Sequence, residues 1–193
     1  MLNADTVLAS THQNDDCEAF DEIVARYKDG IYNYIWRMVS NRDDAEDLAQ
    51  EVFVRAFASM KSFRRESNIR TWLYRIATNL CIDKYRRSSI EKQLITPLMQ
   101  SGDCNEDAKP LDVPDMTYDP ERTYDRTELQ AEVQRALSKL PDKLRSVIIL
   151  YDIEGMSYEE IAETVSCPIG TVKSRIFNAR AQLRKLLKPY IEG

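Results

Sequence analysis

The feature that most constrains this chain is the stretch SYEEIAETVSCPIGTVKSRIFNARAQLRKLLK, residues Ser157–Lys188, which predicts two helices joined by a tight turn. Ser157 is followed three residues later by Glu160, the spacing of a capping box, in which the two side chains satisfy free amide groups at a helix start. The sequence CPIG at 167–170 breaks the first helix, because the residue before proline avoids the helical conformation and glycine permits a sharp turn. The second helix is expected from about Thr171 to Lys188.

This second helix combines an apolar face with a basic surface. Its apolar residues recur at helical spacing and are expected to face a core: Val172, Ile176, Ala179, Leu183 and Leu187. Its other faces carry six basic residues and no acidic one: Lys173, Arg175, Arg180, Arg184, Lys185 and Lys188. Since the protein as a whole has a formal net charge of -5, this local positive charge calls for an anionic partner. A short helix, a turn and a basic helix is the arrangement that places a recognition helix in the major groove of DNA.

The composition favours an all-α protein made of two small helical domains. Of its 193 residues 31% are charged, and only 5 are glycine and 7 proline, which is typical of helix-rich proteins. The charge is segregated, with net charges of -1 over residues 1–90, -6 over 91–125 and +2 over 126–193. We therefore predict a first domain at 1–90, a flexible acidic linker at 91–125 and a second domain at 126–193.

Cysteine and histidine usage gives no support to a metal or cofactor site. The four cysteines lie far apart without a CxxC pair, and His12 is the only histidine. We expect no metal, no cofactor, and reduced thiols in a cytoplasmic protein. The N-terminus lacks a leader pattern and no stretch is long and apolar enough to span a bilayer, so no membrane insertion is expected.

The first half is predicted to contain four helices. Residues Cys17–Val39 are interpreted as two helices broken near Asp29 and Gly30, each with an apolar face. The third, NRDDAEDLAQEVFVRAFASM, begins at residue 41 with acidic residues that suit the N-terminal end of a helix dipole. The fourth, IRTWLYRIATNLCIDKYRR, begins at Ile69 after a short loop.

Two patterns in these helices carry charge. Asp44, Asp47 and Glu51 share one face of the third helix with Gln50 beside them; from spacing alone a solvated face is favoured over a docking surface for a basic partner. Between residues 61 and 87 there are 8 basic side chains with interleaved aromatics, a composition that suits duplex DNA and separated single strands alike.

The second half adds two helices ahead of the opening motif. Residues 123–140 form a helical pattern that ends at Pro141, and the pattern that follows ends at Gly155 in a C-cap position. These helices are expected to supply the packing surface that the two-helix motif needs.

The segments DDAEDLAQEVFVRAF, SFRRESNIRTWLYRIATNLCIDKYRR and LPDKLRSVIILYDIEGMSYEEIAETVSCPIGTVKSRIFNARAQLRKLL, in that order, resemble the extracytoplasmic-function (ECF) sigma factors of bacterial RNA polymerase. The resemblance implies a subunit that binds core RNA polymerase and recognises promoter DNA, as duplex and as melted single strand. It also implies that an anti-sigma factor is a possible further partner.

The resemblance also assigns roles to residues. The expected core-polymerase-binding residues are Asp44, Asp47, Leu48, Gln50, Glu51 and Phe53. The expected contacts to the minus-ten element, with Asn79 reading an extruded base, are Phe63, Arg64, Arg65, Asn68, Trp72, Arg75, Asn79, Lys84, Arg86 and Arg87. The expected contacts to the minus-thirty-five element are Thr171, Lys173, Ser174, Arg175, Phe177, Asn178, Arg180 and Arg184.

Two other hypotheses about the function remain open at this point. An autonomous helix-turn-helix regulator explains the C-terminal half equally well, but gives no role to the basic and aromatic segment at residues 61–87. An enzyme is disfavoured, because the sequence contains no plausible catalytic constellation and no phosphate-binding glycine loop.

Overall fold

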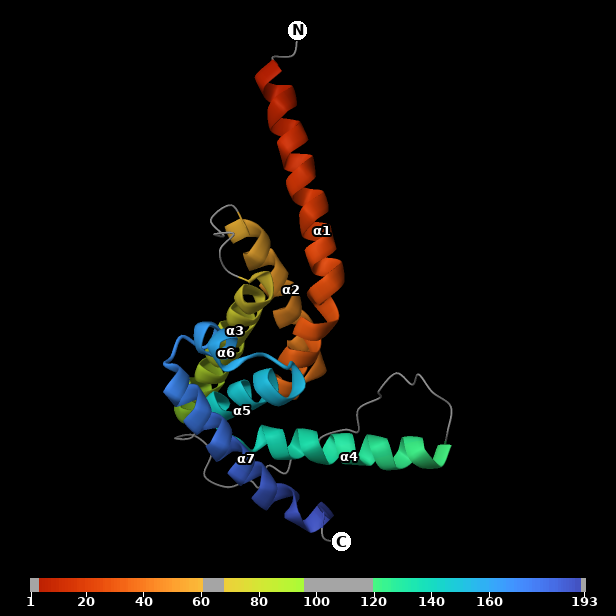
Figure 1. The fold of residues 1–193 in the computed structure, drawn as a ribbon, viewed down its shortest axis with the longest axis vertical. Coiled ribbons are helices and arrows are strands. Elements are labelled where there is room, and N and C mark those ends of the chain that lie inside the picture. Colours follow the sequence, from red (N-terminus) through yellow and green to blue (C-terminus); the bar gives the residue numbers. More distant parts are fainter. Residues whose placement is uncertain (1–3, 61–67, 96–119, 192–193) are drawn as a thin grey trace.

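A computed structural model describes the backbone of residues 4–60, 68–95 and 120–191, and the side chains of 20–60, 68–87 and 128–190. Within these ranges every regular element is a helix, which confirms the all-α prediction (Figure 1). The elements are α1 (Ala4–Val39), α2 (Arg42–Ser59), α3 (Ile69–Ile95), α4 (Pro120–Ser138), α5 (Asp142–Ile148), η2 (Ile149–Ile153), α6 (Tyr158–Thr164) and α7 (Ile169–Ile191).

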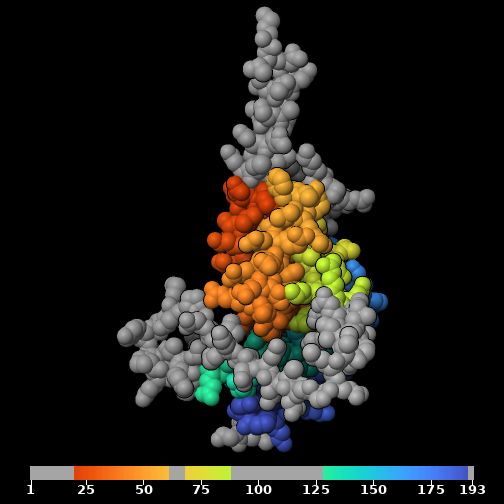
Figure 2. Space-filling view, turned by 180° about the vertical axis from the view of Figure 1, so that it is seen from behind, coloured from red at the N-terminus to blue at the C-terminus, as the bar shows by residue number. Residues whose placement is uncertain are grey.

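The helices form two groups, α1–α3 and α4–α7. Most of the predicted linker at 91–125 lies outside the described residues, and its two ends belong to α3 and α4. In Figure 1 the N-terminal part of α1 extends away from the other helices, whereas its C-terminal part meets the second group. The described parts of α1 and α2 cover much of one face of the molecule (Figure 2).

The predicted break near Gly30 is wrong, because α1 continues through it to Val39. A Cβ at Gly30 would lie 3.0 Å from the Tyr74 hydroxyl oxygen, so the glycine permits α3 to approach α1 closely. Glycine inside a helix costs only about 1 kcal/mol relative to alanine, and tertiary packing overrides that cost here. The same contact region contains an edge-to-face pair of Tyr34 and Tyr74, with ring centroids 5.3 Å apart.

Helix α2 begins where the sequence predicts it. Asn41 is the N-cap, and its side-chain oxygen accepts a hydrogen bond of 3.0 Å from the amide of Asp44. Its buried face is made mainly of small residues, which allow close packing on α1 and α3: Ala45, Ala49, Val52 and Ala56.

One broad face of α3 is buried, and it includes Leu73, Ala77, Thr78 and Cys81. The Thr78 hydroxyl meets the Tyr34 hydroxyl at 2.8 Å, so this polar pair is satisfied inside the core. Burial raises the pKa of the Cys81 thiol to about 12. This thiol is therefore an inert packing residue.

The capping box predicted at Ser157 is confirmed. The Glu160 amide donates to the Ser157 hydroxyl at 3.2 Å, and the Ser157 amide donates to the Glu160 carboxylate at 2.8 Å. The following helix, α7, begins at Ile169, two residues earlier than expected, because the Pro168 carbonyl already accepts helical hydrogen bonds. Most of its apolar face packs as predicted, with Val172, Ile176 and Ala179 buried and Leu183 partly buried, whereas the predicted core residue Leu187 is half-buried and lies outside the core cluster.

Polar side chains of the second group bind the end of α1. The buried Arg145 guanidinium donates to the Met38 carbonyl at 2.5 Å and to the Leu140 carbonyl at 2.8 Å. It also donates to the Ser138 carbonyl and to the Tyr85 hydroxyl.

The Gln134 amide reaches the last turn of α1 as well. It donates to the Ser40 hydroxyl at 2.9 Å and to the Arg37 carbonyl at 3.2 Å. Carbonyl groups at a helix C-terminus have no partner within the helix, so these donors from a distant part of the chain satisfy them. Both helical groups contribute to one continuous hydrophobic core.

Replacing Arg145 by alanine should lower the free energy of unfolding by about 3 kcal/mol, because several buried carbonyls lose their donor at once. Chemical denaturation followed by circular dichroism measures this change. The matched control is Arg55→Ala, since the exposed Arg55–Glu51 pair should contribute about 0.5 kcal/mol or less. Equal effects of the two substitutions would contradict a structural role for Arg145.

Candidate polymerase-binding and DNA-binding surfaces

The solvent-facing side of α2 carries the predicted acidic surface. Asp47 and Gln50 are exposed, and Glu51 is half-buried and pairs with Arg55 at 2.7 Å. Val54 lies on the same side, since it follows Glu51 by three residues and Asp47 by seven, and its side chain is 62% exposed. Acidic residues beside an exposed apolar residue suit a protein partner with a basic and partly apolar surface.

The other predicted polymerase-binding residues lie at the edges of this surface. Leu48 and Phe53 are half-buried and pack against the core, so much of their apolar surface is already used within the chain. Asp44 is half-buried and accepts a 2.5 Å hydrogen bond from the Lys84 ammonium on α3. Asp44 and Lys84, which the sequence assigned to different partners, therefore bind each other and tie α2 to α3.

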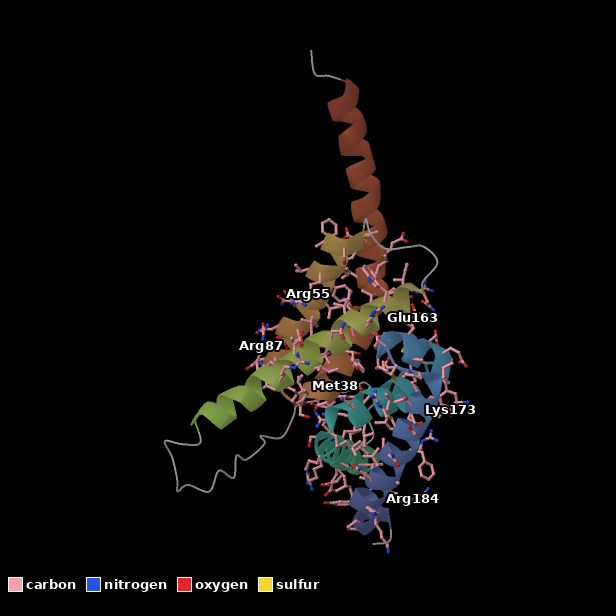
Figure 3. All side chains as sticks on the ribbon, turned by 90° about the vertical axis from the view of Figure 1, so that its left-hand side faces the viewer. Met38, Arg55, Arg87, Glu163, Lys173 and Arg184 are labelled. Carbon is pink, nitrogen blue, oxygen red and sulfur yellow. The ribbon has the colours of Figure 1, made fainter. Side chains whose placement is uncertain are left out.

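The outer face of α3 carries the predicted minus-ten residues. Arg75, Asn79, Arg86 and Arg87 are all exposed, and the first three are spaced so that they form one strip along the helix. Arg87 is labelled at the edge of α3 in Figure 3. Trp72, predicted as a minus-ten contact, is half-buried and packs against the core.

The N-terminal turn of α3 is covered by the second group. The Arg70 guanidinium and the Tyr74 hydroxyl both donate to Glu154, to its carbonyl and its carboxylate respectively. The Asn68 side-chain amide donates to Glu160 at 3.4 Å. Burial raises the pKa of the Tyr74 phenol, so it remains a hydrogen-bond donor at neutral pH. Phe63, Arg64 and Arg65 lie outside the described residues.

The outer face of α7 presents the predicted minus-thirty-five residues. Lys173, Ser174 and Asn178 are exposed, and the Phe177 side chain is 74% exposed although it is apolar. In Figure 3 Lys173 and Arg184 lie along the same edge of α7. The turn before the helix is held more tightly, because the half-buried Arg175 contacts the Cys167 sulfur at 3.7 Å.

The remaining residues of this set have local partners. The Ser174 hydroxyl donates to the Thr171 carbonyl at 3.0 Å, within the first turns of α7. The Arg180 guanidinium forms an ion pair with Asp152. Arg184 is exposed. The outer face of α7 is therefore basic, with an aromatic ring at its centre.

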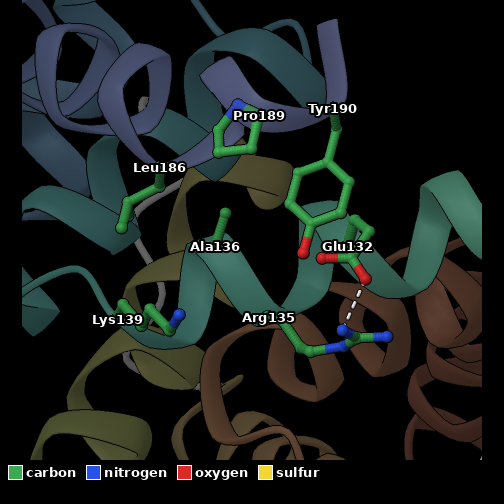
Figure 4. Close-up of a pocket in the computed structure, with 7 residues that line it drawn as sticks. All are labelled: Glu132, Arg135, Ala136, Lys139, Leu186, Pro189 and Tyr190. Carbon is green, nitrogen blue, oxygen red and sulfur yellow. Dashed lines mark ion pairs between the residues drawn. The ribbon is translucent and has the colours of Figure 1, made fainter. Parts of the chain in front are cut away.

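A hollow of about 220 Å³ lies between α4 and the end of α7, away from these surfaces (Figure 4). Glu132 and Arg135 form an ion pair in its lining. Lys139 and Tyr190 also line it. The neighbouring Glu132 carboxylate raises the pKa of the Tyr190 phenol. The charges on this lining are paired or mixed in sign, so the hollow does not form a basic surface for nucleic acid.

No group of three or more histidine, cysteine, aspartate or glutamate side chains among the described residues comes together as a metal ion would require. None of the helices in the described part of the chain has the length and apolarity needed to span a membrane.

Two family models match the chain in the order seen in the structure: Sigma-70 region 2 over residues 23–90 and Sigma-70 region 4 over residues 130–183. Over 173 residues the chain is 42% identical to the ECF RNA polymerase sigma factor SigW of Bacillus subtilis, covering 90% of this chain and 91% of that protein. The chain belongs to the ECF sigma factors. Its function is therefore promoter-specific transcription initiation, and the comparisons do not support an autonomous regulator.

Solved structures similar to this sigma factor have the same fold. One is the sigma factor RpoE in complex with the anti-sigma factor NepR from Bartonella quintana, with a TM-score of 0.68, 29% identity and coverage of 89% of this chain and 98% of that one. Another is CnrH in complex with the cytosolic domain of CnrY, with a TM-score of 0.66, 28% identity and coverage of 97% and 99%.

Sequence reasoning missed two features of this sigma factor. Val54 was left out of the acidic surface because it is apolar, although its helical spacing from Asp47 placed it there. The cover over the start of α3, made by Glu154 and Glu160, joins residues more than eighty positions apart. No local pattern in the sequence signals such a contact.

Proposed function

We propose that this sigma factor binds core RNA polymerase through the solvent-facing side of α2 and grips promoter DNA at two points. The strip on α3 and the loop before it contact the minus-ten element, and the outer face of α7 contacts the minus-thirty-five element. The observation that carries the proposal is the exposure of Lys173, Ser174, Phe177 and Asn178 on one helix whose opposite face is buried.

The polymerase contact is supported by charge and exposure on α2. Asp47 and Gln50 are available to basic and polar groups, and Val54 adds exposed apolar area at the C-terminal end of the acidic surface. Apolar area next to polar groups is usual in a specific protein contact. Asp44 is less available to the polymerase, because its carboxylate already forms an ion pair with Lys84.

The minus-ten contact is supported by the α3 strip. Arg75 and Arg86 are placed to neutralise phosphates, and Asn79 between them can hydrogen-bond an extruded base. Asn79 has no hydrogen-bond partner among the described residues, so its amide is free to act in this way. Opening a base pair costs a few kcal/mol, and capture of the freed base offsets this cost.

The minus-thirty-five contact is supported by the chemistry on α7. An asparagine can pair with adenine at two points, a lysine can donate to guanine, and a phenyl ring can contact the methyl group of thymine. Asn178, Lys173 and Phe177 are exposed in this arrangement. Arg184 is better suited to a phosphate, which positions the helix without specifying sequence.

The contacts between the two helical groups imply a change of arrangement on DNA. The Asn68 side chain donates to Glu160, so this contact must be released before the Asn68 amide can bind promoter DNA. A regulator that binds the packed arrangement would keep the factor inactive. The RpoE structure contains such a partner, an anti-sigma factor, and we propose a partner of this kind for the present chain. These events would take place in the cytoplasm, with the polymerase.

Reconstituted transcription tests the proposal as a whole. Bacterial core polymerase with this protein should produce transcripts from a subset of a genomic promoter pool, whereas core polymerase alone should not. Sequencing of the transcript starts should reveal shared elements about ten and thirty-five base pairs upstream. Absence of any promoter-dependent transcript would contradict the function.

Reversing the charge at Asp47 should weaken binding to core polymerase by about tenfold, because one favourable rim contact becomes repulsive. The matched control is Glu46→Lys on the neighbouring face, where only an exposed pair with Arg42 is disturbed. Glu51 is left intact because it pairs with Arg55. Fluorescence anisotropy measures both affinities, and equal losses would indicate that the acidic face is not the docking surface.

Replacing Asn178 by alanine should change the preferred base at one or two positions of the upstream element. Replacing Arg184 by alanine should instead weaken binding to all sequences alike and reduce the salt dependence by about one phosphate contact. Selection from a promoter library with a randomised upstream element distinguishes the two effects. Identical profiles for both variants would show that the reading face of α7 is assigned wrongly.

A further inference from the structure

A cluster of aromatic and charged side chains borders the outer face of α7. The Tyr151 and Tyr158 rings are stacked, with centroids 4.9 Å apart and an angle of 11° between their planes. Arg180 lies over the Tyr151 ring at 5.2 Å and Lys173 over the Tyr158 ring at 5.3 Å. Each ring of the stack therefore holds one cation of α7.

The cluster depends on the π-helix η2. Its wider turn is closed by the Glu154 amide donating to the Ile149 carbonyl, five residues back, at 3.0 Å. Such a turn contains one residue more than an α-helical turn, which rotates the following side chains by about 100°. Ile149 and Leu150 remain buried, while Tyr151 and Asp152 are directed to α7.

Asp152 fixes the Arg180 guanidinium in one orientation. Its carboxylate accepts from Nε at 3.1 Å and also from Nη2, which is the two-point geometry of an arginine and a carboxylate. Arginine has five N–H donors, so those of Nη1 remain available to another acceptor. The guanidinium is held from the side by Asp152 and from its face by Tyr151, and it still has donors to offer.

The two held cations stand on either side of an exposed ring. Phe177 is four residues after Lys173 and three before Arg180, so the three side chains form one strip on α7. Phe177 is 74% exposed and has no polar group of its own. A strip of a cation, a phenyl ring and a cation in fixed positions presents a defined shape to the groove of DNA.

We propose that Asp152 and the Tyr151–Tyr158 stack are positioning residues that set the sequence specificity of the upstream DNA contact rather than its strength. They act through Arg180 and Lys173 and touch no base themselves. The inference rests on the proposed function, in which α7 reads the upstream promoter element. It adds three residues outside the recognition helix to those that determine which promoters are chosen.

The negative charge of Asp152 determines whether its removal strengthens or weakens binding to DNA. A carboxylate near the DNA-binding face repels phosphate, so its removal should strengthen binding to any sequence. The same removal frees a side chain with many rotamers, so the geometry needed to discriminate between bases is lost. A residue needed only for folding would instead weaken binding to all sequences in parallel.

The test uses the full chain with core polymerase. A promoter library with a randomised upstream element is first selected with the wild-type protein, and binding to one selected and one scrambled promoter is then measured. For Asp152→Asn and Asp152→Ala we expect binding to the scrambled promoter to rise about twofold and the ratio of selected to scrambled binding to fall about tenfold. Glu163→Gln, the same charge change at an exposed position of α6, should leave the ratio unchanged.

Substitutions of Tyr151 distinguish a role of the aromatic stack in sequence specificity from a general effect on folding. Tyr151→Phe keeps a ring beneath Arg180 and should retain the wild-type ratio, whereas Tyr151→Leu should lower it. A parallel loss on both promoters, or an unchanged ratio in the Asp152 variants, would overturn the inference. If the wild-type protein itself showed no upstream preference, the proposed function would fail, which is a different and separately visible result.

Discussion

A buried guanidinium holds the two halves of this protein together. Arg145 donates to the Met38 carbonyl at the end of α1, to the Leu140 carbonyl after α4, and to the Tyr85 hydroxyl on α3. A buried cation is costly unless its donors are well paired, and here most of the pairing comes from carbonyls that helix ends leave free. Arg145 therefore helps to fix how the end of α1 lies against the second half, together with Gln134 and the shared hydrophobic core.

The packing between the halves divides the predicted binding residues into two classes. The α2 surface around Asp47 and the outer face of α7 are exposed and available to partners. At the N-terminal turn of α3, the predicted minus-ten residue Asn68 is exposed but bonded to Glu160, and the neighbouring Arg70 is bonded to Glu154. A factor in this arrangement can meet the polymerase before it can make every contact to the promoter.

Much of the fold was predictable because it is encoded locally. The capping box at Ser157 and the buried face of α7 follow from spacing within a few turns of helix, and both are confirmed. The predicted break at Gly30 failed because a contact with Tyr74, forty-four residues away, decides the role of that glycine. The pairing of Asp44 with Lys84 was equally out of reach, since each charge by itself indicated only a surface. The assignment of binding roles depends on the resemblance and on exposure together, because spacing alone favoured a solvated face on α2.

Several of the hydrogen bonds between the described parts of the two halves end on main-chain oxygen atoms. Gln134 and Arg145 bind carbonyls of Arg37 and Met38, and Arg70 binds the carbonyl of Glu154. A main-chain carbonyl is present whatever side chain its residue carries, so substitutions along the end of α1 leave these acceptors in place. At these points the packing of the two halves therefore depends on the donors Arg70, Gln134 and Arg145 and not on the side chains of Arg37 and Met38.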